Sequence, residues 1–280
     1  MKILFRGACL SRNTFDNIVE DFELVSCNKQ RVDYALETIC SPGAAVSVKA
    51  LKSVIPMDEM LEAQIRAQER SIFSYDDVRA IVMDSYSELV DVRFVHENSG
   101  TRFFATYSDV KRTPGLLEML RSDGRLDLSG LRAHYDEFFR QVERVYGDIP
   151  VLYLVFPSDF EDREEFLVRH VAVEAAIREV AAGRRNVTVF KPGLVEKNPN
   201  DEMTYHFSYA TYLSFARQIC AKVPWLKLKR RTMVQRIYER KKYADGWRRI
   251  TVLSFLNVAY RRHCGIRKAW LGPPDRYAFY

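Results

Sequence analysis

The sequence of 280 residues lacks long hydrophobic runs. A helix that crosses a membrane needs roughly 20 consecutive apolar residues, and no run approaches that length. The apolar residues 2–6 are followed at once by polar residues, so they are too short for the hydrophobic part of a signal peptide. We therefore expect neither a membrane-spanning helix nor a signal peptide.

Cysteine is scarce, and its arrangement excludes two kinds of site. The five cysteines are an odd number, are widely spaced and include no Cys-x-x-Cys pair. They are Cys9, Cys27, Cys40, Cys220 and Cys264. This pattern argues against a disulfide framework and against a zinc site, and it favours a reducing cytoplasm. We expect no bound metal and no bound cofactor.

Acidic residues are scarce in one part of the chain. Residues 222–280 contain 16 lysines and arginines but only three acidic residues, whereas the rest of the chain is acidic overall. Such an asymmetry indicates an anionic partner, which is a membrane surface, a phosphorylated ligand or a nucleic acid.

Short apolar runs alternate with helical patterns, as is typical of an α/β fold. The pattern predicts a doubly wound parallel sheet of five strands, with strand order 2-1-3-4-5. The expected strands are residues 2–6, 22–26, 79–84, 150–156 and 186–190. The expected helices are residues 57–70, 131–147, 161–183 and 209–223.

One polar, glycine-containing segment interrupts this alternation. Residues 95–130 are interpreted as a loop or lid insertion over the carboxyl edge of the sheet. Pro224 marks a boundary after the last expected helix. We therefore predict an α/β domain at 1–222 and a basic, aromatic-containing helical extension at 223–280.

The first expected strand runs into the sequence GACLSR, where several reactive groups occur together. Ligands of open α/β sheets bind at the carboxyl ends of strands, and Gly7 permits a tight turn there. A helix that begins near residues 13–14 would direct its free N–H groups at Cys9 and lower its pKa, with Arg12 adding positive charge. Cys9 is then a candidate nucleophile. The alternative is that Cys9 is a small buried hydrophobic residue.

A cysteine nucleophile needs a base, and His206 is the best candidate among the five histidines. It lies in a polar loop after the fifth expected strand, at the same sheet edge as Cys9. Asp201 and Glu202 lie shortly upstream and would orient the imidazole ring. The alternative is an ordinary exposed histidine.

Charged residues follow the third expected strand. Asp84 ends that strand, and Glu88, Asp91 and Arg93 come next. Two interpretations stay open: a structural network of ion pairs, or groups that orient Arg12 and bind a substrate hydroxyl.

The basic extension combines cationic clusters with Trp225, Trp247 and Trp270. Its apolar run 250–260 is flanked by arginines, a pattern typical of a helix that lies on anionic lipid. We expect residues 225–270 to contact an anionic membrane surface, and the alternative is a helix packed on the domain. No nucleic-acid motif is present, which argues against nucleic acid as the partner.

Three blocks together resemble a known family. The run GACLSRN at 7–13 resembles the first block of SGNH/GDSL hydrolases, and Cys9 takes the place of their serine. It is more similar to the opening Gly-Ser-Cys-Val-Ser-Arg-Asp of bacterial SGNH-like proteins of the DUF6270 type. The acidic block 89–94 and the block from His206 to Tyr212 are similar to further blocks of that group. The resemblance covers roughly residues 1–222.

This resemblance implies a flavodoxin-like SGNH fold and a site that contains Cys9 or Ser11 together with His206. More distant relatives with a cysteine at this place are the WcbI-like capsule-polysaccharide enzymes, regarded as acetyltransferases. The implied function is acyl transfer, with acetyl-CoA as a candidate donor, or ester hydrolysis on a bacterial surface polysaccharide or its lipid-linked precursor. The site would then include Gly7 and Arg12, and the enzyme would work at the cytoplasmic face of the inner membrane. The alternative is a non-catalytic SGNH-like protein that binds carbohydrate or phosphate.

Overall fold

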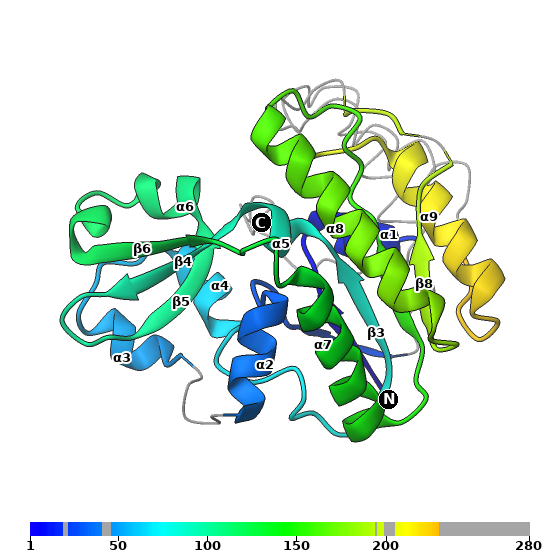
Figure 1. Cartoon of the computed structure of the whole chain (residues 1–280), viewed down its shortest axis with the longest axis horizontal. Helices are drawn as coiled ribbons and strands as arrows, with labels where there is room; N and C mark the ends of the chain where they lie inside the picture. The colour runs from blue at the N-terminus through cyan, green and yellow to red at the C-terminus, as the bar shows by residue number, and fades with distance from the viewer. Residues whose placement is uncertain (19–21, 41–45, 194, 199–204, 230–280) are drawn as a thin grey trace, which may run out of the picture. The chain divides into compact units, whose positions relative to one another are not determined.

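Five parallel strands form the main sheet, and each coincides with an apolar run predicted from the sequence. The computed structural model describes residues 1–18, 22–40, 46–193, 195–198 and 205–229. The strand order is β2-β1-β3-β7-β8, which confirms the predicted order. Figure 1 labels β3 and β8 of this sheet. The strands are β1 (Lys2–Arg6), β2 (Glu23–Ser26), β3 (Val78–Asp84), β7 (Val151–Leu154) and β8 (Val187–Phe190).

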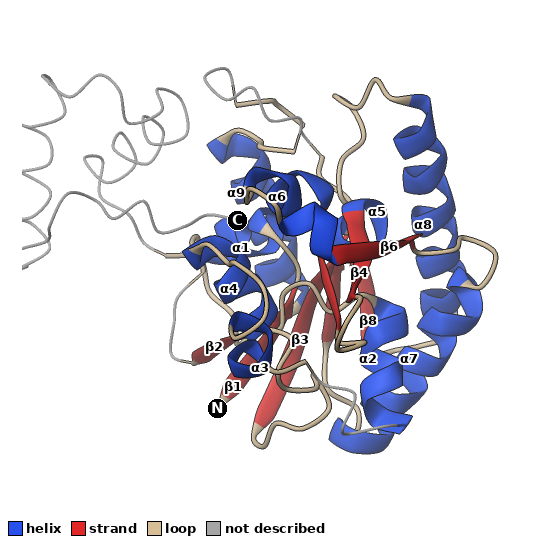
Figure 2. Cartoon of the chain, turned by 90° about the vertical axis from the view of Figure 1, so that its left-hand side faces the viewer, coloured by secondary structure: helices blue, strands red, loops and turns tan. Residues whose placement is uncertain are grey.

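Each of the four predicted helices coincides with a helix of the structure, whereas residues 32–40 form a helix that was not predicted. Helices α2 (Val32–Cys40), α7 (Leu131–Tyr146) and α8 (Glu164–Ala182) lie side by side along the sheet (Figure 2). The apolar face of α7 is buried, and the helix ends at Gly147, whose φ of 73° suits glycine. Since strands β1, β3 and β7 are almost wholly buried, they have the continuous apolar sequence that a parallel sheet requires.

The chain divides into two units, each of which is described by itself. The first comprises Met1–Arg12 and Glu20–Phe190. The second comprises Asn13–Val19 and the chain from Lys191 onward. Helix α1 (Cys9–Phe15) begins in the first unit, and α9 (Tyr209–Lys222) belongs to the second.

The basic extension lies largely beyond this description. The helix expected on lipid, residues 250–260, is outside the described residues, so the domain boundary at residue 222 stays a prediction. Within the described part of the chain, no helix combines the length and the apolar character that crossing a membrane requires.

Residues 95–130 are not a loop, which corrects the sequence-based prediction. They contribute most of a three-stranded antiparallel sheet with strand order β5-β4-β6. Its elements are β4 (Asp91–His96), β5 (Arg102–Thr106), α6 (Tyr107–Arg112), the 3-10 helix η2 (Leu116–Met119) and β6 (Leu120–Arg125). A function of this segment as a lid stays a prediction.

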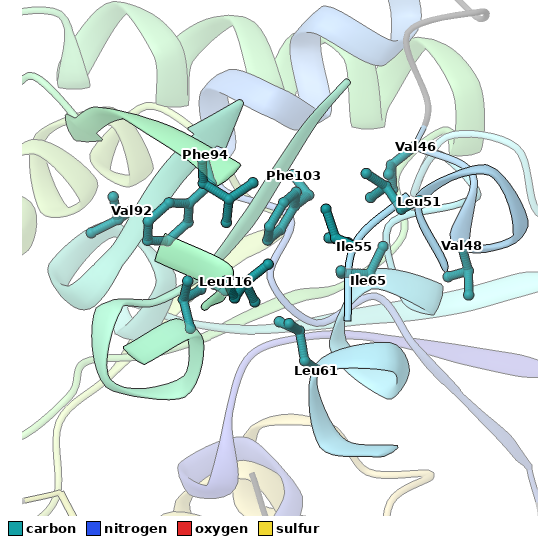
Figure 3. Close-up of a cluster of buried hydrophobic side chains, with 13 residues drawn as sticks. Val46, Val48, Leu51, Ile55, Leu61, Ile65, Val92, Phe94, Phe103 and Leu116 are labelled. Carbon is teal, nitrogen blue, oxygen red and sulfur yellow. The ribbon is translucent and has the colours of Figure 1, made fainter. Parts of the chain in front are cut away.

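This small sheet has a hydrophobic core of its own (Figure 3). Helices α3 (Val48–Lys52) and α4 (Glu59–Arg66) contribute to it, and Asp58 caps α4 by accepting a hydrogen bond from the Leu61 N–H. Phe94 and Phe103 stack at the centre of the cluster with ring centroids 5.8 Å apart. The buried members are Val46, Val48, Leu51, Ile55, Leu61, Ile65, Val92, Phe94, Phe103, Ala105, Val110, Leu116 and Leu120.

We expect Phe103→Ala to lower the free energy of unfolding by about 3–5 kcal/mol, because a fully buried ring leaves a cavity. Val54→Ala, at an exposed position, should change it by less than about 1 kcal/mol. Urea denaturation of both variants measures the difference. Equal midpoints for the two variants would show that the small sheet does not depend on this core.

Candidate active site

The tip of β1 leads directly into a short helix. Strand β1 ends at Arg6, and α1 begins at Cys9, whereas the sequence predicted a start near residues 13–14. The Arg12 N–H already donates to the Ala8 carbonyl at 3.2 Å, a helical hydrogen bond. Cys9, Ser11 and Arg12 therefore belong to the first turn of α1 and do not precede it.

The Asp84 carboxylate, at the end of β3, holds this turn. Its Oδ2 atom accepts hydrogen bonds from the Ala8 N–H at 2.9 Å, the Ser11 N–H at 3.2 Å and the Ser11 hydroxyl at 2.7 Å. Its Oδ1 atom accepts from the Tyr86 N–H at 3.1 Å. Burial raises the pKa of Asp84, and these hydrogen bonds oppose that rise. Asp84 thus ties the tip of β1 to the tip of β3.

Ser11 is fully buried, and its hydroxyl donates to Asp84. A serine in this position supports the neighbouring turn and does not offer its oxygen to a substrate. This geometry favours the interpretation of Ser11 as a supporting donor over its interpretation as the nucleophile.

Gly7 is required here by a close approach. A Cβ atom at this position would lie 2.5 Å from Ser11 Oγ and 2.6 Å from Asp84 Oδ2. Because both oxygens belong to the hydrogen-bonded group just described, neither can move away at low cost. Glycine therefore provides the space in which Ser11 and Asp84 meet.

Cys9 is partly exposed, as a nucleophile must be, but its thiol is not acidic. Burial raises its pKa to about 12, and the negative charge of Asp84 adds to that rise. Hydrogen bonds with the backbone amides of Cys9 and Leu10 and the charge of Lys29 lower the pKa but are outweighed. The expected depressed pKa was therefore wrong, and the Cys9 thiol is neutral at physiological pH.

The other charged residues predicted for the site lie in different parts of the fold. Arg12 is exposed on α1. Glu88, on α5 (Tyr86–Val90), is fully buried, forms an ion pair with Arg6 and also accepts the Val32 N–H at 3.0 Å. Of the two interpretations left open for Glu88, this geometry matches the structural ion pair, and its partner is Arg6 and not Arg12.

Arg93 lies on β4 in the small antiparallel sheet. Its Nε atom donates to Asp123 Oδ2 at 3.3 Å, and both side chains are partly exposed. The structure therefore does not bring Arg93 into the group around Asp84.

His206 belongs to the second unit, and Cys9 belongs to the first. The His206 side chain is partly exposed, and its backbone carbonyl accepts a hydrogen bond from the Asn198 N–H at 3.1 Å. Asp201 lies outside the described residues. The pairing of His206 with Cys9, and of Asp201 with His206, stays a prediction.

The sequence analysis missed Lys29, a buried lysine in the loop between β2 and α2. Its Nζ atom lies 2.7 Å from Asp91 Oδ1 and 4.9 Å from the centre of the Tyr86 ring. A lysine in a polar loop normally predicts exposure. The one signal available was position, because the loop follows β2 at the same sheet edge as Cys9.

None of the described residues form a group of three or more histidine, cysteine or acidic side chains that would hold a metal ion. The structure brings together four residues that were predicted for the site: Gly7, Cys9, Ser11 and Asp84.

No family model matches the chain, and no curated protein matches it. Similar solved structures include an acetyl xylan esterase, Est2A, from the rumen bacterium Butyrivibrio proteoclasticus, with 13% sequence identity and a TM-score of 0.36. Another is a family two carbohydrate esterase from Clostridium thermocellum in complex with cellohexaose, with 13% identity and a TM-score of 0.38. Each alignment covers 80% of this chain. The chain spans 64% of the length of the acetyl xylan esterase and 65% of the length of the family two carbohydrate esterase.

We expect Asp84→Asn to lower the free energy of unfolding by about 1–3 kcal/mol. The amide NH₂ group would have to face the N–H and O–H donors that the carboxylate now accepts. The exposed Asp148→Asn serves as the matched control and should stay within about 0.5 kcal/mol of the wild type. Equal free energies of unfolding for the two variants in urea denaturation would show that the hydrogen bonds accepted by Asp84 do not stabilise the fold.

The raised pKa of Cys9 predicts an alkylation rate that rises about tenfold per pH unit up to pH 10, because the thiolate fraction grows throughout that range. A short cysteine peptide, with a pKa of about 8.5, should level off near pH 9.5. Iodoacetamide labelling followed by peptide mass spectrometry separates Cys9 from the exposed Cys40. A plateau below pH 9 at Cys9 would contradict the structure.

Proposed function

We propose that this protein transfers or hydrolyses an acyl group, with Cys9 as the nucleophile. The observation that carries the proposal is the position of Cys9, a partly exposed residue at the carboxyl end of β1 whose turn is held by the hydrogen bonds of Asp84. Strand tips of open α/β sheets are where such proteins bind ligands. A thiol held on a rigid turn meets the geometric need of nucleophilic catalysis.

In the proposed reaction the Cys9 sulfur bonds to the acyl carbon, and its S–H bond breaks. Because the pKa of the thiol is about 12, a base must take the proton during the attack. His206 is the base proposed from the sequence, with Asp201 to orient it. The leaving alkoxide or thiolate takes up a proton, and a thioester remains on Cys9.

In the second step an acceptor hydroxyl or water attacks the thioester. The base removes the proton of the acceptor, the carbon–sulfur bond breaks, and the sulfur recovers a proton. Exposed Arg12 and backbone N–H groups would stabilise the oxyanion of each tetrahedral intermediate.

The substrate belongs to the same proposal. The sequence resemblance favours acetyl-CoA as the donor and a bacterial surface polysaccharide or its lipid-linked precursor as the acceptor. Contact with an anionic membrane through residues 225–270 would bring the enzyme to such a precursor. Of that region the structure describes residues 225–229, in which Trp225 is exposed.

A second candidate function is a non-catalytic protein that binds carbohydrate or phosphate. The raised pKa of Cys9 favours it, because a neutral thiol without a base is a poor nucleophile. In this case the polar group at the strand tips would recognise a ligand and catalyse nothing.

Intact-protein mass spectrometry after exposure to acetyl-CoA, or to p-nitrophenyl acetate, tests the proposal. We expect an acetyl adduct on the wild type that is lost in Cys9→Ala and slowed at least about 100-fold in His206→Ala. Folded Ser11→Ala should keep the adduct, because the Ser11 hydroxyl faces Asp84. An adduct that persists in Cys9→Ala would exclude Cys9 as the nucleophile, and no adduct with either donor would favour the binding protein.

A further inference from the structure

The loop between β2 and α2 is hydrogen-bonded to the last residues of β1. These residues shortly precede Cys9 in the sequence. The Cys27 N–H donates to the Phe5 carbonyl at 2.6 Å, and Arg6 Nε donates to the Gln30 carbonyl at 2.6 Å. Both ends of the segment that holds Lys29 are therefore fixed to the last residues of β1.

The backbone of Lys29 is strained, which makes the choice of lysine informative. Its φ is 60°, in the left-handed region that favours glycine and asparagine. Residues held in such conformations cluster at functional sites, where the surrounding structure maintains them. The contacts of the surrounding residues must therefore hold Lys29 in this conformation.

The side chain of Lys29 is buried, and it carries its ammonium group to the tip of β3. Nζ pairs with Asp91 Oδ1 at 2.7 Å and lies over the Tyr86 ring. The Tyr86 N–H donates to Asp84. Asp84 in turn accepts the N–H of Ala8, the residue before Cys9. A chain of direct contacts thus leads from the ammonium group to the turn of the nucleophile.

The charges around Cys9 indicate the role of the Lys29 ammonium group. Asp84 is an anion close to the sulfur, and its charge opposes a thiolate. Arg6 and Glu88 form a separate buried ion pair, and neither is among the charges that most affect the pKa of Cys9. The charge of Lys29 favours the thiolate at Cys9, and Asp91 holds the ammonium group in place.

We propose that Lys29 is a positioning residue whose buried ammonium charge stabilises the negative charge that develops on the Cys9 sulfur. This inference rests on the proposed function for its use in catalysis. Lys29 neither gives nor takes a proton: the S–H proton goes to the base, and the electron pair of that bond forms the bond to the acyl carbon. Asp91 fixes the direction of the cation through the ion pair at 2.7 Å.

The alternative is an ion pair that serves stability alone, and the sign of the effect separates the two. Removing the cation with Lys29→Met makes the surroundings of Cys9 more negative, so alkylation of Cys9 at pH 9 should slow about threefold to tenfold. Removing the anion with Asp91→Asn leaves the cation uncompensated, so alkylation should become faster, but by a smaller factor, because Lys29 and not Asp91 is among the charges that most affect the pKa of Cys9. A purely structural pair predicts that both variants loosen the fold and expose Cys9, so both would be labelled faster.

Iodoacetamide labelling of Cys9, read by peptide mass spectrometry, is compared among the wild type, Lys29→Met, Asp91→Asn, the double variant and Lys29→Arg. Lys29→Arg keeps the charge and should stay within about twofold of the wild type. Lys52→Met, which breaks the exposed ion pair with Glu62, is the matched control and should not change the rate. Thermal unfolding shows which variants are folded.

Slower labelling of Cys9 in Lys29→Met together with faster labelling in Asp91→Asn supports the role of Lys29. Shifts in the same direction, or no shift in either variant, would overturn it. If a single variant does not fold, the double variant decides, because it buries no uncompensated charge: slower labelling than the wild type supports the role, and an equal rate overturns it. Equal rates in all labelled variants would leave the proposed function standing, whereas a Cys9 that no variant labels at pH 10 would overturn both.

Discussion

The hydrogen bonds that Asp84 accepts are the constraint on which the candidate site depends. One carboxylate at the tip of β3 binds two backbone amides and a hydroxyl from the turn after β1. This arrangement requires glycine at position 7, buries Ser11 and fixes where Cys9 emerges. It also has a chemical cost, because burial and the charge of the same carboxylate both raise the pKa of the Cys9 thiol. Rigidity and reactivity oppose each other at this turn.

Two buried ion pairs lie beside this turn. Arg6 pairs with Glu88, and Lys29 pairs with Asp91, so charges of both signs lie under the strand tips. Removing ions from water is expensive, and buried pairs often add little net stability compared with apolar residues of the same size. Their value is better sought in specificity and electrostatics. A fixed cation near a thiol is one such use, because it acts at short range in a medium that screens charge weakly.

The main sheet was predictable because its central strands are buried on both faces and have continuous apolar sequences, as in β1 and β7. The small sheet was not, since β6 exposes most of its polar residues and its core combines helices from residues 48–66 with strands from 91–125. The same limit applies to the site. Gly7 and Cys9 could be placed by a local motif, whereas the burial of Lys29 depends on a partner 62 residues away in sequence.

A thiol with a pKa of about 12 faces a further demand in a two-step acyl transfer. The thiolate of such a group is a strong nucleophile but a poor leaving group, so the thioester formed on Cys9 would resist the second step. Negative charge develops on the sulfur both when the proton leaves and when the carbon–sulfur bond breaks. A cation held near that sulfur therefore assists both steps, and a base that only removes the thiol proton assists the first. In the proposed reaction Lys29 and the base are consequently not interchangeable: the base governs the movement of protons, and Lys29 lowers the energy of the sulfur anion common to attack and departure.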